Sequence, residues 1–282
     1  MFVILINKLI IEFEKNYLET IKIKKTHSIA LFAIGSPCKF GHLTNKDFRS
    51  KLIANFMSWV TKTLKSTLGR KLIMALTGLF LILFLIGHLA GNMQLFYNDG
   101  GEAFNIYAKF MTTNPIVKLL SYLTYLSVIG HVIYSIGLSR LNKSARPIGY
   151  AVSGSSTNSS MASRNMGILG TIILLFLVGH MYSFWYQMHW GAIPTVTYEG
   201  EEYKDLYAVV QVAFQQTWMV ALYVIAMAFL AFHLSHGFAS AFQSLGINHK
   251  KYSPAIKTVG LVFCIVVPVL FAAMPVYIYF NS

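Results

Sequence analysis

Long uncharged stretches rich in apolar residues alternate with short charged segments from residue 72 to the end of the chain. The hydrocarbon core of a bilayer is about 30 Å thick, so a helix needs roughly 20 consecutive apolar residues to cross it. Leu, Met, Ala and Phe dominate these stretches, and none alternates apolar and polar residues with the period of two that barrel strands show. The pattern predicts five membrane-crossing helices, one in each of the ranges 72–98, 119–139, 165–198, 206–249 and 258–282.

The last two ranges depart from a simple crossing. Range 206–249 is much longer than one crossing, so either its helix protrudes or its ends, 206–212 and 241–248, lie at the membrane interfaces. Range 258–282 contains Pro268 and Pro275, which predict a kink. It holds no histidine, so we expect a peripheral helix.

The signs of the charges in the connecting segments predict the orientation. Basic residues that flank membrane helices prefer the cytoplasmic side. All six carboxylates beyond residue 56 lie after the first and third ranges, whereas the other connections are purely basic. We therefore predict an all-α integral membrane bundle of five transmembrane helices, with the N-terminus cytoplasmic and the C-terminus outside.

Residues 1–56 do not share this pattern. MFVILINKLII is too short to span and is interrupted by Lys8, and SIALFAIGSPC, which loosely resembles a lipoprotein signal, is also short. We interpret 1–56 as an atypical N-terminal extension that is either not translated, with translation beginning at Met57, or disordered. Residues 57–282 then form the membrane domain, in which the Ser-rich range 141–163 predicts a flexible cytoplasmic connector.

Composition excludes several classes of protein. The chain is 55% hydrophobic and only 12% charged, whereas soluble domains carry roughly a quarter charged residues. Its net charge of +13 requires no nucleic acid, because the cations lie where anionic headgroups of the lipid bilayer and a cytoplasmic partner would be. Cys38 and Cys264 are too few for a cysteine-ligated cluster, and no Cys-x-x-Cys-His attaches haem covalently. Phosphate-loop, dinucleotide and hydrolase motifs are also absent.

Histidines inside the apolar ranges are the candidate chemistry. A lone histidine in a membrane helix is more often an interhelical hydrogen-bonding residue than a ligand. Four helices that each supply one change this balance, because two opposed imidazoles saturate a haem iron and suit it to electron transfer. The five histidines in predicted spans are His88, His131, His180, His233 and His236.

Depth along the helices predicts how these histidines pair. With about 1.5 Å of rise per residue, His88 and His180 lie roughly 24 to 26 Å from the inner surface, and His131 lies about 14 Å from it. His233 lies roughly 42 Å along its helix from the external Asp205, toward the inside. We therefore predict an outer haem between His88 and His180 and an inner haem between His131 and His233.

A glycine directly precedes three of these histidines. Gly87, Gly130 and Gly179 would let the backbone approach a flat porphyrin closely, although small-residue packing is the ordinary alternative. His236 lies one turn beyond His233 on the same face. It would bind a haem propionate, shape a quinone pocket or replace His233 as the ligand.

Three long strings resemble a known family. They are RKLIMALTGLFLILFLIGHLAGNMQLF at 70–96, SSMASRNMGILG at 159–170 and FHLSHGFASAFQSLG at 232–246. In this order they are similar to the di-haem cytochrome b subunit of succinate dehydrogenase, and the resemblance covers residues 57–282.

The resemblance implies a five-helix membrane anchor of respiratory complex II in the bacterial inner (cytoplasmic) membrane. It implies two b haems, flavoprotein and iron–sulfur subunits docked on the cytoplasmic face, and menaquinone as the quinone. Succinate itself would be oxidised in the flavoprotein, so the chain alone would not be catalytic. The four haem ligands implied are His88, His131, His180 and His233, and His236 is the less favoured because related subunits vary there.

Two features complete the predicted site. Ser163 and Arg164 begin the third helix on the inner side, where they would bind a haem propionate or line a quinone pocket, or serve only as an N-cap and an inside anchor. Unlike some fumarate-reducing relatives, the chain has no carboxylate within a span, so Asp99 and Glu102 are the nearest candidates for proton coupling.

Two alternatives remain open from the sequence. One is the cytochrome b subunit of a hydrogenase or formate dehydrogenase, which also binds haem between helices. The other is a transporter or channel with proton-relaying histidines, although such proteins often bury carboxylates or break their helices at mid-membrane. The direction of the reaction, succinate oxidation or fumarate reduction, is not determined by the sequence.

Overall fold

The computed structural model describes residues 45–145 and 160–281. The chain divides into two compact units, residues 1–59 and 60–282. Most of the predicted N-terminal extension and most of the Ser-rich connector lie outside the described residues. Residues 45–59, the described part of the first unit, belong to helix α2 (Asn45–Lys65). Helix α2 carries the exposed apolar side chains of Ile53, Phe56 and Trp59.

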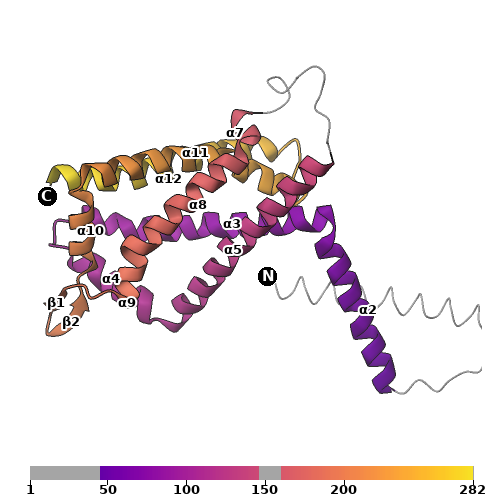
Figure 1. Ribbon diagram of the computed structural model, residues 1–282, viewed down its shortest axis with the longest axis horizontal. Coiled ribbons are helices and arrows are strands. Elements are labelled where there is room, and N and C mark those ends of the chain that lie inside the picture. The colour runs from indigo at the N-terminus through magenta and orange to yellow at the C-terminus, as the bar shows by residue number, and fades with distance from the viewer. Residues whose placement is uncertain (1–44, 146–159, 282) are drawn as a thin grey trace, which may run out of the picture. The chain divides into compact units, whose positions relative to one another are not determined.

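Five helices of the described residues are long and apolar enough to cross a membrane. They suggest a multi-pass membrane protein, as the uncharged ranges predicted, and Figure 1 shows their course. The helical segments are α3 (Thr67–Asn92) with its 3-10 extension η1 (Met93–Phe96), α5 (Pro115–Ser144), α8 (Met166–His180) with the π-helix η2 (Met181–Tyr186) and α9 (Gln187–Trp190), α11 (Thr217–Ser244), and α12 (Ser253–Asn281).

Local sequence explains where two of these helices begin. The Ser66 hydroxyl accepts a hydrogen bond from the backbone N–H of Gly69 at the start of α3. The Asn114 side chain accepts from the N–H groups of Ile116 and Val117 at the start of α5, and Pro115 occupies the first helical position. Both side chains satisfy N–H groups that have no partner within the helix.

Helix α11 holds the bundle together. It packs against α3, α8 and α12, while α3 also packs against α5, and Figure 1 shows α11 and α12 running side by side. A Cβ atom at Gly260 of α12 would lie only 2.5 Å from the Phe238 ring of α11. The missing side chain therefore allows these two helices to approach closely.

Helix α12 is more central than the sequence suggested. It runs through Pro268 and Pro275 as one helix, and both prolines are buried, as are Cys264 and Ile278. Phe271 of the same helix contacts the His88 ring, with 5.6 Å between the ring centroids. The absence of histidine therefore did not predict a peripheral position, because packing depends on the shape of a helix and not on its ligands.

The outward surfaces of the long helices are strongly apolar. Exposed residues include Leu83, Leu126 and Leu175, each with about two thirds of its surface open. Soluble monomers rarely expose apolar patches as extensive as this, and lipid tails are the solvent that such a surface suits.

A small polar platform closes the end of the bundle near the C-terminus. We use this name for α4 (Glu102–Thr113), β1 (Thr195–Tyr198), β2 (Glu201–Lys204) and α10 (Leu206–Phe214). The two strands pair antiparallel across Glu199 and Gly200, whose φ angles are 50° and 83°. Positive φ at both central residues is typical of a tight hairpin turn. The all-α prediction missed this hairpin because its strands have only four residues each.

Range 206–249 is divided between two helices, α10 and α11. The chain leaves the helix at Gln215 and begins again at Thr217. The range therefore contains a short helix of the platform followed by one membrane-length helix, and it is not a single protruding helix.

Candidate functional site

His88 and His180 come together between α3 and the end of α8. Their ring centroids are 5.8 Å apart, and the ring planes are nearly perpendicular, at 89°. Phe84 stacks on His88 at 5.3 Å, and Phe176 stacks on His180 at 5.9 Å. Aromatic rings therefore surround both imidazoles. We call these two residues the outer pair, after their predicted depth.

His131 of α5 and His233 of α11 form a second pair, which we call the inner pair. Their ring centroids are 6.3 Å apart, with 65° between the planes. Small residues of other helices face both rings. A Cβ atom at Gly78 of α3 would lie 3.4 Å from Cε1 of His131, and one at Gly170 of α8 would lie 3.8 Å from Cε1 of His233. The two pairs are those that the depths along the helices predicted.

The spacing within each pair suits two imidazoles on one metal. An imidazole nitrogen binds a transition metal at about 2.0 Å, and the ring centroid lies about 1.1 Å beyond that nitrogen, given ring bonds of about 1.35 Å. Two opposed rings on one metal therefore have centroids about 6.2 Å apart. Both observed distances, 5.8 and 6.3 Å, lie close to this value.

Each pair offers only two ligands. The described residues contain no group of three or more His, Cys, Asp or Glu side chains that could hold a metal ion. The pairs therefore suit a metal whose other ligands come from a second molecule, as the four nitrogens of a porphyrin do for haem iron.

Hydrogen bonds occupy one nitrogen of several of these rings. The Tyr223 hydroxyl lies 3.0 Å from Nδ1 of His180, and Thr77 Oγ1 lies 3.2 Å from Nδ1 of His131. Nδ1 of His233 is buried without a hydrogen-bond partner in the described part of the chain. A partner at Nδ1 leaves Nε2 as the nitrogen available to a metal, which is the usual arrangement of a ligating histidine.

The amide of Asn92 holds His88 differently. Its Nδ2 donates to the backbone oxygen of His88 at 2.7 Å and lies 3.4 Å from Nδ1 of the same ring. A donor at Nδ1 requires the ring hydrogen to be on Nε2. Ligation through Nε2 therefore requires the Asn92 amide to turn, so that its oxygen faces Nδ1.

Open space adjoins the outer pair. A Cβ atom at Gly87 or Gly179 would meet no other atom within 4 Å, whereas one at Gly130 would lie 3.9 Å from Cγ2 of Thr77. Gly179 lines a cavity of about 360 Å³ between α8 and α11, together with His180 and Tyr223. Of the three glycines, Gly179 thus borders the cavity beside His180, and the role of all three beside a porphyrin stays a prediction.

The other predicted site residues are His236, Ser163 and Arg164. His236 is half-buried on α11, one turn beyond His233. Ser163 and Arg164 end the short helix α7 (Met161–Arg164), which packs against α11. The N-cap of that helix is Ser160, whose hydroxyl accepts from the Ser163 N–H at 3.2 Å. The alternative role of Ser163 as an N-cap is therefore wrong.

Sequence reasoning did not find the residues that hold the imidazoles. Asn92 follows His88 by one helical turn, so helical spacing could have found it. Thr77 and Tyr223 contact histidines of other helices, 54 and 43 residues away in the chain. No local pattern marks such contacts, because they depend on how the helices are packed.

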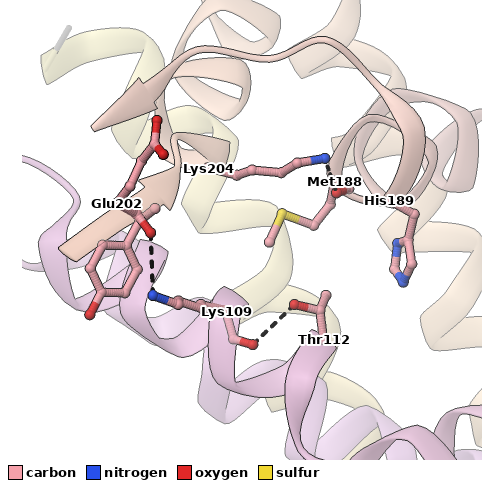
Figure 2. A pocket seen from close by; sticks show the side chains of 7 residues that line it. Lys109, Thr112, Met188, His189, Glu202 and Lys204 are labelled. Atoms are coloured by element: carbon pink, nitrogen blue, oxygen red, sulfur yellow. Dashed lines mark hydrogen bonds between the residues drawn. The ribbon is translucent and has the colours of Figure 1, made fainter. Parts of the chain in front are cut away.

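A second cavity, of about 330 Å³, lies at the polar platform (Figure 2). Lys109 of α4 donates to the backbone oxygen of Glu202, and Lys204 of β2 donates to that of Met188, as Figure 2 shows. Lys109 also forms an ion pair with Glu201 at 2.9 Å. The two ammonium groups thus join the hairpin to α4 and α9, and the cavity contains none of the predicted site residues.

Comparisons with protein-family models, with curated proteins and with solved structures found no significant match.

Proposed function

We propose that the chain is the cytochrome b membrane-anchor subunit of a succinate dehydrogenase or fumarate reductase. In this proposal it carries electrons between an iron–sulfur subunit and membrane quinone through two b haems. The observation that supports it most is the meeting of four imidazoles from four helices in two pairs, with centroids 5.8 and 6.3 Å apart. Bound there, haem supplies one-electron transfer.

The protein's own residues have three tasks in this proposal. The outer and inner pairs bind iron, one haem between each two histidines. Phe84, Phe176 and Phe271 pack against the outer imidazoles and exclude water from them. Thr77 and Tyr223 hold imidazole Nδ1 atoms, and such partners orient a ligand and raise its basicity.

Arrangement in the membrane follows from the charges. With the N-terminus inside, the basic segments face the cytoplasm, and we place the flavoprotein and iron–sulfur subunits there. Arg164 and Ser163 then lie on the inner side for a haem propionate or a quinone, and His236 lies beyond the inner pair. The family strings support menaquinone as the quinone and the bacterial inner membrane as the location.

The alternatives predict different purified proteins. A cytochrome b of a hydrogenase or formate dehydrogenase would also bind haem but would co-purify with a different enzyme. A transporter would be colourless. The rings of Phe84 and Phe176, stacked on the outer imidazoles, favour a bound planar cofactor over a water-filled proton path.

Haem quantification on the purified full chain tests the proposal. Reduced-minus-oxidised spectra should show two b haems per chain. Alanine variants of His88, His131, His180 and His233 should each lose one haem or fail to assemble, whereas His236→Ala should keep both and serves as the matched control. A colourless wild type, or two haems in any of the four variants, refutes the haem assignment.

The enzyme partner needs a separate measurement. Affinity purification from membranes should recover a succinate-oxidising flavoprotein with the chain, and succinate should reduce its haems. Recovery of a hydrogenase or formate dehydrogenase with a haem-containing chain would instead support the second candidate.

A further inference from the structure

The Thr77 hydroxyl is committed to the backbone of its own helix. Oγ1 lies 2.8 Å from the carbonyl oxygen of Ile73 and 3.1 Å from that of Met74, in the preceding turn of α3. Carbonyl oxygens only accept hydrogen bonds, and a hydroxyl has one hydrogen to donate. The Thr77 hydrogen is therefore directed to the backbone, and the lone pairs of Oγ1 remain free to accept.

The same oxygen lies 3.2 Å from Nδ1 of His131 on α5. Since Oγ1 can only accept in this contact, Nδ1 must carry the hydrogen. A neutral imidazole has one N–H, so Nε2 of His131 keeps its lone pair, which is the form that binds a metal. We propose that Thr77 is a positioning residue that sets the tautomer and the ring rotation of His131 for iron ligation through Nε2. This inference rests on the proposed function.

Close packing on both sides of the contact supports a fixed ring. Gly78 follows Thr77, and a Cβ atom there would lie 3.4 Å from Cε1 of His131. Gly130 precedes His131, and its Cβ would lie 3.9 Å from Cγ2 of Thr77. The Thr77-Gly78 dipeptide of α3 thus faces the Gly130-His131 dipeptide of α5. The ring of His233, in contrast, has no partner for Nδ1 among the described residues, so His131 is the anchored member of the inner pair.

Three substitutions distinguish the effect of the Thr77 hydroxyl from the effect of the volume of the side chain. Thr77→Val keeps the shape and removes the acceptor. Thr77→Ser keeps the hydroxyl and removes the methyl group. Thr124→Val is the matched control: Thr124 is a buried residue on the same helix as His131, and its hydroxyl donates to the Leu120 carbonyl at 2.9 Å. Each is measured in the purified full chain for haem content, for a redox titration of both haems, and for the EPR spectrum of the ferric protein.

Loss of the acceptor should favour the reduced inner haem. Without a partner at Nδ1 the imidazole is a weaker donor and stabilises ferric iron less. In Thr77→Val, the ratio of reduced to oxidised inner haem at a fixed potential should rise roughly threefold, the size expected from one neutral hydrogen bond. One of the two EPR signals should shift, because such a signal depends on the rotation of the imidazole rings that would hold the iron. Thr77→Ser and Thr124→Val should match the wild type.

The other possible outcomes also support or overturn the role of Thr77. Loss of one haem in Thr77→Val, with both retained in Thr77→Ser and Thr124→Val, also supports the inference. Two haems with unchanged potentials and EPR signals in Thr77→Val overturn it and leave the proposed function intact. Equal shifts in Thr77→Ser and Thr77→Val, or the same haem loss in Thr124→Val, overturn it in favour of packing. A wild type without haem overturns the proposed function together with this inference.

Discussion

Asn105 links α4 to β1 and to the start of α10 by hydrogen bonds, and its removal should weaken haem binding at the outer pair before the inner pair. Its side chain is completely buried and makes three hydrogen bonds. Nδ2 donates to the Tyr198 hydroxyl at 3.2 Å and to the Asp205 carboxylate at 2.9 Å, and Oδ1 accepts from the Tyr207 N–H at 2.9 Å. Two neutral bonds at about 0.5–1.5 kcal/mol each and one charged bond at about 1.5–3 kcal/mol set the scale. We expect Asn105→Ala to lower the free energy of unfolding by about 3–4 kcal/mol.

The loss should reach the outer pair through α10. Phe214 of this helix packs against Tyr223 at 4.9 Å and against Phe184 at 5.8 Å, and both of these rings contact His180. Thermal release of haem, followed by difference spectra in detergent, should therefore show the outer haem leaving Asn105→Ala at a lower temperature. The inner haem should be released near the wild-type temperature.

Asn281→Ala is the control for this experiment. Asn281 is exposed and makes one hydrogen bond, to the Tyr277 carbonyl at 2.8 Å, so its loss should cost less than about 1 kcal/mol. If Asn105→Ala and Asn281→Ala are equally stable, the buried amide does not hold the platform. If both haems leave Asn105→Ala together, the path through α10 is wrong.

Three further predictions follow from side chains near the two sites. Tyr223→Phe should shift the potential of the outer haem alone, whereas Tyr125→Phe, which removes a hydroxyl bonded to Trp185 at 2.8 Å, should shift neither. Gly179→Val should leave the protein folded, because its Cβ meets no atom within 4 Å, but should release the outer haem. Full haem content in this variant would show that the haem does not occupy the space beside Gly179. The hydrogen bond from Lys109 lowers the pKa of Glu201 below its ordinary value of 4.5. The ion pair is thus intact above that pH and lost as the pH falls through the lowered pKa. Protection factors of the hairpin amides, corrected for the pH dependence of intrinsic exchange, should therefore fall on acidification in the wild type but not in Glu201→Gln.

The element order was largely readable from the sequence. Uncharged lengths determine whether a helix can cross a membrane, and charges end the crossing wherever they occur. The helices begin and end within a few residues of the expected ranges, except at the α10–α11 break and at the β1–β2 hairpin. At Gln215 and Gln216 the chain breaks without any charge, and the β1–β2 hairpin relies on a Glu-Gly turn. The glutamines do not end an uncharged stretch, and strands of four residues are too short to show an alternating pattern.

The contents of the candidate site were readable only in part. Depth along each helix predicted which histidines would be level with one another, because the rise per residue is constant. It did not predict Phe271 beside His88, or Thr77 beside His131. These contacts depend on the rotation of each helix about its own axis and on which helices are neighbours. A single sequence carries little information on either.

The sequence by itself determined that this chain has five membrane-length helices and that four of them carry an imidazole at two matched depths. Only the tertiary structure decided that the imidazoles face one another and that a hydroxyl of α3 lies 3.2 Å from Nδ1 of His131. The physical reason is that hydropathy determines for each helix separately whether it can cross a membrane. Which side chains point toward a neighbouring helix is determined by the packing between helices. Close approaches such as Gly260 against Phe238 fix that packing, and they join residues that are distant in the chain.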